Sequence, residues 1–321
     1  MRIVILCGIA ASLPGFAAVH RVVAEHYWHT FSAAHPVLLT VEPGDRIVTK
    51  TVDSAGFDFS GVRRTRTHGN PLTGPFFIKG AEKGDTIEVR IDRLRLNRAS
   101  GYTGYQVGIK DASPAGVKPA ADAVYKGYDT LVPWTIDLRR ALVRHGRLEF
   151  AAQPMLGCMG VAPEGGYSPR SGPTGYWGGN MDYNMVREGA TVLLPVFHEG
   201  ALLFFGDGHA LQGDGEAVGS GVETSLDVEV TVGLRKGRAL TGPRLETPDW
   251  LVSIGGKEGG NLNESVGIAV RDMLQWLTAG HGLGAEEAHL LIGTRGRFDI
   301  ITLGGNAGLR IPRKDVERLR R

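Results

Sequence analysis

The stretches HPVLLTVEPGDRIVTKTVDSAGFD (35–58) and PFFIKGAEKGDTIEVRIDRLRL (75–96) decide the fold. Each contains an apolar run, a turn of the form Glu-x-Gly-Asp, and a second run in which apolar and polar residues alternate. The turns at 42–45 and 82–85 indicate that the second stretch is an internal repeat of the first. A strand, a tight turn and an alternating strand are typical of a β-hairpin, so we predict two hairpins. A repeated hairpin without helical crossovers favours an antiparallel sandwich or barrel.

Most of the remaining chain also has the pattern of β-structure. In one of its strands, Val228, Val230 and Val232 alternate with polar residues. A helical pattern occurs only late, in NESVGIAVRDMLQWLTAGHG (263–282), and a short helix and a strand follow it. The predicted fold class is mainly β, with β-sandwich and small β-barrel units and a smaller α+β C-terminal part. We expect an N-terminal sandwich region at 19–135, a central β region at 136–240 and the α+β segment at 241–321.

Composition excludes several classes of protein. The 321 residues include 36 basic and 34 acidic side chains, with no polybasic run outside the extreme C-terminus, so no nucleic-acid surface is expected. Glycine is unusually frequent, with 47 residues, which fits a strand protein with many tight corners. The only cysteines are Cys7 and Cys158, so a disulfide framework is not expected. Cys158 is interpreted as a small buried residue.

Residues 1–18 have the pattern of an export signal. Arg2 precedes an apolar run from Ile3 to Leu13, which Pro14 and small residues follow. Cleavage is expected near Ala17 or Ala18, giving a periplasmic or secreted protein, or a cytoplasmic one if the signal is not used. The run is short for a membrane helix, so no stable membrane span is expected. A mis-assigned start or a buried first strand is the alternative.

The segment FFGDGHALQGDGE (204–216) carries four ionisable groups among glycines. Asp207 and His209 are two residues apart, as are Asp214 and Glu216, so in an extended chain each pair would point to one face. Oxygen and imidazole ligands at a strand end suit Zn²⁺ or another divalent ion. The alternative is a glycine-rich hairpin whose aspartates bind their own backbone.

A second cluster lies in MLGCMGVAPEGGYSPRSGPTGYWGGNMDYN (155–184), which contains Glu164, Asn180 and Asp182. A long irregular segment inside a compact protein is usually functional or disordered, and its aromatic residues argue against disorder. Asn180 is alternatively a residue that holds a left-handed turn. No GxSxG elbow occurs, so a serine nucleophile is not expected.

From about residue 20 to the C-terminus, the chain resembles the acetamidase/formamidase family. Six blocks in order carry the resemblance: HPVLLTVEPGD, NPLTGPFFIKGAEKGDTIEV, LGCMGVAPEGG, GGNMD, GATVLLPVFHEGALLFFGDGHALQGDGE and AHLLIGTRGRFDI. GGNMD and GDGHALQGDGE are closer to the acetamidase branch. The resemblance implies hydrolysis of a small linear amide to a carboxylate and ammonia, a divalent metal that is often zinc, and a homo-oligomer.

The resemblance also implies which polar positions to consider. The matching positions are His26, Asn180, Asp182, Asp207, His209, Asp214, Glu216 and Glu223. Where the family commonly has His before GGN, this chain has Trp177, which implies an impaired site or a pocket for a bulkier amide.

We therefore predict that Asp182, His209 and Asp214 hold a divalent ion, with Asp207 and His26 as further candidate ligands. Zinc is the expected ion, with calcium or another divalent ion as alternatives. Glu216 or Glu164 is the predicted general base, and Asn180 the predicted donor to the oxyanion. The alternatives are a lactam hydrolase and a secreted, non-catalytic protein that binds a small ligand; Trp177 favours the latter.

Overall fold

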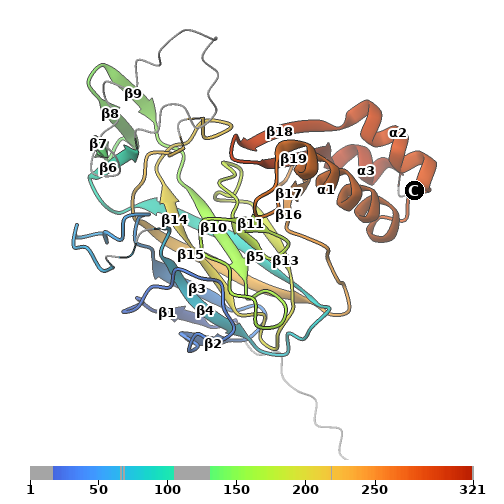
Figure 1. Cartoon of the computed structure of the whole chain (residues 1–321), viewed down its shortest axis with the longest axis horizontal. Helices are drawn as coiled ribbons and strands as arrows, with labels where there is room; N and C mark the ends of the chain where they lie inside the picture. The colour runs from blue at the N-terminus through green and yellow to red at the C-terminus, as the bar shows by residue number, and fades with distance from the viewer. Residues whose placement is uncertain (1–16, 66, 68, 105–130, 218, 320–321) are drawn as a thin grey trace, which may run out of the picture.

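The computed structural model describes residues 17–319 except 66, 68, 105–130 and 218 (Figure 1). Of the predicted export signal, only Ala17 and Ala18 belong to the described residues, and the rest lies outside them. The described strands form sheets of nine, six and four strands. This confirms a mainly β fold with a smaller α+β C-terminal part.

The nine-stranded sheet takes its strands from both ends of the chain. Its order is β1 (Val19–Arg21), β3 (Arg46–Lys50), β15 (Leu226–Arg235), β5 (Thr86–Leu96), β13 (Thr191–Pro195), β16 (Arg244–Glu246), β17 (Trp250–Gly255), β19 (Asn306–Pro312) and β18 (Arg297–Thr302). Only the β1–β3 pair is parallel. Because one sheet includes strands from all three predicted parts of the chain, the boundaries at 135 and 240 do not separate its strands.

The other two sheets are smaller. The six-stranded sheet has the order β11 (Thr174–Gly175), β12 (Gly178–Asn180), β10 (Met155–Val161), β14 (Leu203–His209), β4 (Leu72–Ile78) and β2 (Leu39–Val41). The four-stranded sheet has the order β6 (Ser100–Gly104), β7 (Leu131–Asp137), β8 (Leu142–His145) and β9 (Leu148–Ala151), and it lies at one end of the molecule in Figure 1.

The two predicted hairpins are wrong, although the repeat itself is real. β2 and β4 lie in the six-stranded sheet and pair with each other in parallel, while β3 and β5 lie in the nine-stranded sheet. Each Glu-x-Gly-Asp turn therefore carries the chain from one sheet to the other. The physical reason is burial: the apolar run and the alternating run of each stretch belong to opposite layers of a sandwich.

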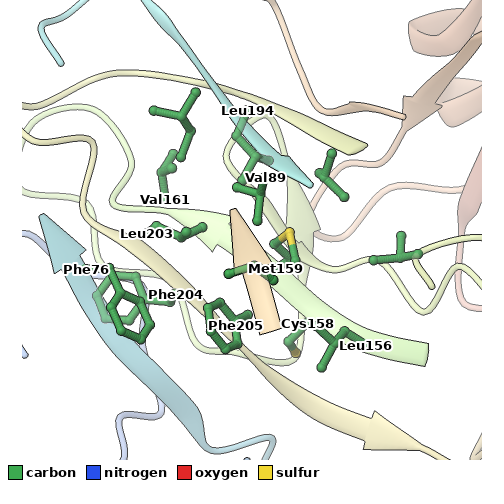
Figure 2. Close-up of a cluster of buried hydrophobic side chains, with 14 of the residues drawn as sticks. Phe76, Val89, Leu156, Cys158, Met159, Val161, Leu194, Leu203, Phe204 and Phe205 are labelled. Carbon is green, nitrogen blue, oxygen red and sulfur yellow. The ribbon is translucent and has the colours of Figure 1, made fainter. Parts of the chain in front are cut away.

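The main core fills the space between the two larger sheets (Figure 2). Val89 and Leu194 of the nine-stranded sheet meet Leu156 and Phe205 of the six-stranded sheet in one cluster of buried side chains. Phe205 stacks on Phe76, with the ring centroids 5.2 Å apart. The site described below is built at one margin of this core, on β10, β12 and β14.

Helices cover one end of the nine-stranded sheet (Figure 1). They are α1 (Leu262–Gln275), which continues as the π-helical turn η2 (Trp276–Gly280), α2 (Ala285–Arg295) and α3 (Arg313–Leu319). The predicted late helix, short helix and strand are thus confirmed. The buried ion pair between Arg244 of β16 and Asp272 of α1, at 2.8 Å, ties the helical layer to the sheet. Among the described residues, no helix has the length and apolar character to cross a membrane.

Replacing Phe205 tests the sandwich core. We expect Phe205→Ala to lower the free energy of unfolding by about 3–5 kcal/mol, because it removes a fully buried ring and leaves a cavity. Phe150→Ala is the matched control, since Phe150 of β9 is 46% exposed, and it should cost less than about 1 kcal/mol. Urea denaturation followed by fluorescence measures both; equal losses would contradict the assignment of the core.

Candidate functional site

Strand β10 brings the two predicted motifs together. It pairs with β12 on one side and β14 on the other, so Cys158 lies opposite both Asn180 and Gly206. The end of GGNMD and the start of GDGHALQGDGE are therefore neighbours in space, although about 25 residues separate them along the chain.

Five side chains converge at this point: Asp182, Asp207, His209, Glu216 and Glu223, called here the carboxylate–histidine cluster. Ligand atoms of Asp182, His209 and Glu216 lie within 4.8 Å of one another, as do those of Asp207, His209 and Glu223. The imidazole is common to both groups: its Nε2 lies 3.2 Å from Glu223 Oε1 and 3.6 Å from Asp207 Oδ1.

The backbone is specialised at the cluster. Asp182, Asp207 and Glu216 have φ values of 50°, 59° and 43°, in the left-handed region that side chains other than glycine rarely adopt. Gly157 of β10 makes room for two carboxylates, since a Cβ there would lie 2.5 Å from Asp182 Oδ1 and 2.6 Å from Asp207 Oδ2. Strained backbone conformations of this kind concentrate at functional sites.

Gln212 fixes the orientation of the imidazole. Its Nε2 donates to the carbonyl oxygen of Asp182 at 2.6 Å, so its Oε1 is left to accept from His209 Nδ1, also at 2.6 Å. The Nδ1 proton is thereby held on the side away from the carboxylates, and Nε2 faces Asp207 and Glu223. A ligating histidine is commonly held by such a bond from its second nitrogen.

Two asparagines hold the carboxylates. Asn70, which precedes β4, donates from Nδ2 to Asp207 Oδ2 at 2.8 Å and to Asn180 Oδ1 at 2.7 Å. Asn180 in turn donates from its Nδ2 to Asp182 Oδ2. Amides supply N–H donors to carboxylates without adding charge, so the negative groups are oriented but not neutralised.

Burial and mutual repulsion shift the pKa values of the acids upward. Burial, followed by repulsion from Glu216 and Asp207, raises the pKa of Asp182 well above its ordinary value. Burial and then Glu223 raise the pKa of Asp207, and burial is the main cause that raises the pKa of Glu216 to about 7. Burial alone would lower the pKa of His209. The nearby carboxylates of Glu223 and Asp207 have the larger effect, so the pKa of His209 is raised well above its ordinary value.

The unsatisfied atoms of the cluster fit a cation. Four buried polar atoms of the cluster have no hydrogen-bond partner among the described residues: Asp182 Oδ1, Asp207 Oδ1, His209 Nε2 and Glu223 Oε2. Buried polar groups without a partner are costly, and a divalent ion would satisfy acceptors of this kind together. Carboxylate and imidazole donors suit zinc and other divalent transition ions.

A cavity of about 360 Å³ opens at the cluster. Its wall includes Asp182, Glu216 and Asn180 on one side and segments around Lys257 and Asn306 on the other. Asn306 of β19 also donates to the carbonyl oxygens of Asn180 and Met181, at 3.3 Å each. The C-terminal segment therefore completes the cavity that the central motifs begin.

The structure brings together five of the predicted site residues: Asn180, Asp182, Asp207, His209 and Glu216. It does not bring the other three, Asp214, Glu164 and His26, into the cluster. Glu164 is exposed and pairs with Lys83 at the surface, and the side chain of His26 is exposed.

The prediction that Asp214 and Glu216 point to one face is wrong. The chain turns at this place, with φ values of 81° at Gly215 and 43° at Glu216, so the alternation of an extended strand does not apply. Asp214 is exposed and accepts a hydrogen bond from Asn184 at 2.6 Å, while the Glu216 side chain turns inward.

Trp177 lies in the core and not in the cavity wall. It is 2% exposed and makes edge-to-face contacts with Tyr167 and Tyr176. Gly175 provides the space for its ring, since a Cβ there would lie 2.1 Å from the indole. The residues that line the cavity do not include Trp177, so a change of substrate pocket through this residue has no support in the structure.

Cys158 is buried as predicted, and it lies against the cluster. Its Sγ is 2.8 Å from Asn180 Oδ1 and 3.8 Å from Asp207 Oδ2. Burial, with the negative charges of Asp207 and Asp182, raises the pKa of the thiol well above its ordinary value. The thiolate needed for a nucleophile is therefore disfavoured.

Sequence reasoning gave no role to Glu223, Gln212 or Asn70. Glu223 stands among the matching polar positions and Asn70 opens the NPLTGP block, so both could have been found within the family motifs. Gln212 follows His209 by three residues inside GDGHALQGDGE, and only the turn after β14 brings its amide back to the imidazole.

Known proteins resemble this chain in sequence and in fold. Residues 167–296 match the model of the Acetamidase/Formamidase family. A proposed formamidase of Schizosaccharomyces pombe is 29% identical in an alignment of 214 positions that covers 51% of this chain and 50% of the relative. The chain thus spans about half the length of the curated relative that it matches.

Solved structures extend the likeness over almost the whole chain. A predicted acetamidase/formamidase from Thermoanaerobacter tengcongensis is 30% identical with a TM-score of 0.79, covering 94% of this chain and 98% of that one. An acetamidase from Yersinia enterocolitica is 28% identical with a TM-score of 0.79, covering 94% of both chains. A gamma lactamase from Delftia acidovorans, 21% identical with a TM-score of 0.56 over 90% of this chain and 89% of that one, shares the fold.

Substitutions in the cluster test its capacity for metal. We expect His209→Ala and Glu223→Gln each to weaken zinc binding at least about tenfold, because even groups one step removed from a metal contribute that much. Asp214→Asn, which changes an exposed carboxylate in the same segment, should leave binding unchanged. Metal per chain is measured after dialysis against limiting zinc; equal retention by all three variants would contradict the ligand set.

Metal binding should depend on pH. Because the pKa values of Glu216, Asp182 and His209 are raised, a cation that enters the cluster is expected to displace protons from it. Zinc affinity should therefore rise with pH from about 5 to 8. Calorimetry at pH 7 in buffers of different ionisation enthalpy should show proton release, and an affinity independent of pH would refute this.

Proposed function

The chain belongs to the acetamidase/formamidase family, and on this premise we propose that it is a metal-dependent amidohydrolase of small linear amides. Its members act on carbon–nitrogen bonds of amides other than peptide bonds, and the expected products are a carboxylate and ammonia. The observation that carries the metal dependence is a set of four buried atoms, at Asp182, Asp207, His209 and Glu223, to which no described residue offers a hydrogen bond.

The proposed ligands differ in part from those that the sequence favoured. Asp182 and His209 are retained, Asp207 becomes a principal ligand, Glu223 joins them, and Asp214 is left out because it is exposed and bonded to Asn184. When bound, a divalent ion, with zinc preferred, would supply Lewis acidity for the amide carbonyl and make water more acidic.

Glu216 is the proposed general base. It borders the cavity, its carboxyl lies near Asp182 and His209, and burial places its pKa at about 7, close to the value that serves proton transfer best at neutral pH. Its carboxylate takes a proton from the attacking water and delivers it to the departing nitrogen. Glu164 is left out of this role because it is exposed and paired with Lys83.

Asn180 is proposed to meet the substrate. Its side chain borders the cavity, and its amide keeps one N–H beyond the one that it donates to Asp182. A donor in this place would stabilise the oxygen of the amide as negative charge develops. We further propose, from the family resemblance, that the protein works as a homo-oligomer.

The general-base role of Glu216 has a direct test. We expect Glu216→Gln to lower the rate of ammonia release from acetamide or formamide by about 10²–10⁴-fold, because the amide cannot accept a proton. Chelation of the wild-type protein should abolish the same activity, and added zinc should restore it.

Glu164→Gln is the matched control, since it changes an exposed glutamate and should keep full activity. An active Glu216→Gln variant would remove Glu216 from the mechanism. Turnover that survives chelation would overturn the metal dependence. If the protein opens a lactam ring but releases no ammonia from linear amides, the substrate class is cyclic amides and not linear ones.

A further inference from the structure

The carboxylate of Asp45 binds the first residues of the described chain. Asp45 closes the first Glu-x-Gly-Asp turn, where its Oδ2 accepts from the backbone N–H of Glu42 at 2.9 Å. Its Oδ1 accepts from the backbone N of Ala18 at 2.7 Å, and Oδ2 also lies 2.7 Å from His20 Nε2. The side chain is 7% exposed, so this carboxylate is largely shielded from water.

The position of Ala18 is fixed by more than this one bond. Its carbonyl oxygen accepts from Arg46 N at 2.8 Å, and the next residue, Val19, begins β1 on the edge of the nine-stranded sheet. Ala17 and Ala18 are nevertheless exposed. The peptide bond between them is therefore accessible to an enzyme and lies at the start of the described residues.

The second turn of the repeat provides an internal comparison. Asp85 makes the same turn contact with Glu82 N, at 2.8 Å, and there the carboxylate also lies 2.8 Å from the ammonium of Lys236. At the first turn, the backbone N of Ala18 approaches Asp45 at a comparable distance. The place of Ala18 N is taken at the second turn by the backbone N of Gly237, 2.8 Å from Asp85 Oδ1. An ammonium at Ala18 N would therefore give Asp45 a charged partner at Oδ1, in addition to His20 at Oδ2.

The preceding residues have the composition of a cleavage site. Gly15 and Ala17 are small residues three and one positions before the Ala17–Ala18 bond, after an apolar run. Cleavage one bond later would place Phe16 where a small residue is required. We infer that a leader peptidase hydrolyses the Ala17–Ala18 bond, and that the new N-terminal ammonium of Ala18 pairs with Asp45.

The covalent step is a simple hydrolysis. Water adds across the amide bond, its oxygen joins the carbonyl carbon of Ala17 to give a carboxylate, and the nitrogen of Ala18 becomes an ammonium. The nitrogen need not move to form the ion pair, since 2.7 Å already suits a charge-assisted N–H···O bond. Asp45 thus binds the N-terminus that processing creates, so removal of the leader is expected to stabilise the fold.

The first test is the N-terminus of the mature protein. The full chain with a C-terminal tag is expressed in a bacterial host that has a leader peptidase, and the purified protein is examined by intact mass and N-terminal sequencing. The expected product begins at Ala18. An uncleaved chain, or a start at any other residue, would overturn the assignment of the cleaved bond.

The second test separates the ion pair from folding in general. Chains that begin at Ala18 and at Ala17 are released from a fusion partner by a protease that leaves no extra residue. Asp45→Asn should lower the Tm of the Ala18 chain by about 2–4 °C more than that of the Ala17 chain, whose ammonium is displaced by one residue.

Asp85→Asn is the matched control, because its partner Lys236 is the same in both chains, and it should lower both Tm values equally. An equal effect of Asp45→Asn on the two chains would overturn the pairing of Asp45 with the new N-terminus. Neither test depends on amide hydrolysis, so the outcome is independent of the proposed activity.

Discussion

The site depends on one electrostatic constraint: four carboxyl groups, three of them buried and Glu216 half-buried, lie around a single imidazole. Carboxylates this close cannot all be ionised without a compensating positive charge, which is why burial and repulsion raise the pKa values of Asp182, Asp207 and Glu216. Protons provide that charge in part, but they leave acceptors without partners. A divalent cation would satisfy charge and acceptors together, so the same electrostatic cost in the protein alone is what supports the proposed metal site.

The sandwich supplies the rigidity that this arrangement requires. β10 holds β12 and β14 in fixed register, and Gly157 leaves space for two carboxylates. Asn70, just before the strand next to β14, orients the carboxylate of Asp207. Asn306 reaches from the nine-stranded sheet to the backbone of the GGNMD segment. Residues spread over more than 200 positions of the chain thus share the cost of holding strained backbone at Asp182 and Asp207.

Local patterns predicted the strands, the late helix and most of the site, because alternation and glycine-rich motifs are local properties. They failed where the outcome depended on contacts between distant segments. The Glu-x-Gly-Asp turns connect two sheets instead of two paired strands, and strand alternation misplaced Asp214 because the chain leaves the extended conformation at Gly215. Gln212 was missed for the same reason, since the turn after β14 decides which group faces His209.

The most direct test of the metal centre is anomalous X-ray diffraction at the zinc edge from crystals of the zinc-loaded protein. A peak about 2.0–2.2 Å from His209 Nε2, with a carboxylate oxygen of Asp182, Asp207 or Glu223 at the same range, is the predicted result. Zinc found only at exposed carboxylates such as Asp214 or Glu164, or no zinc peak at all, would contradict the account.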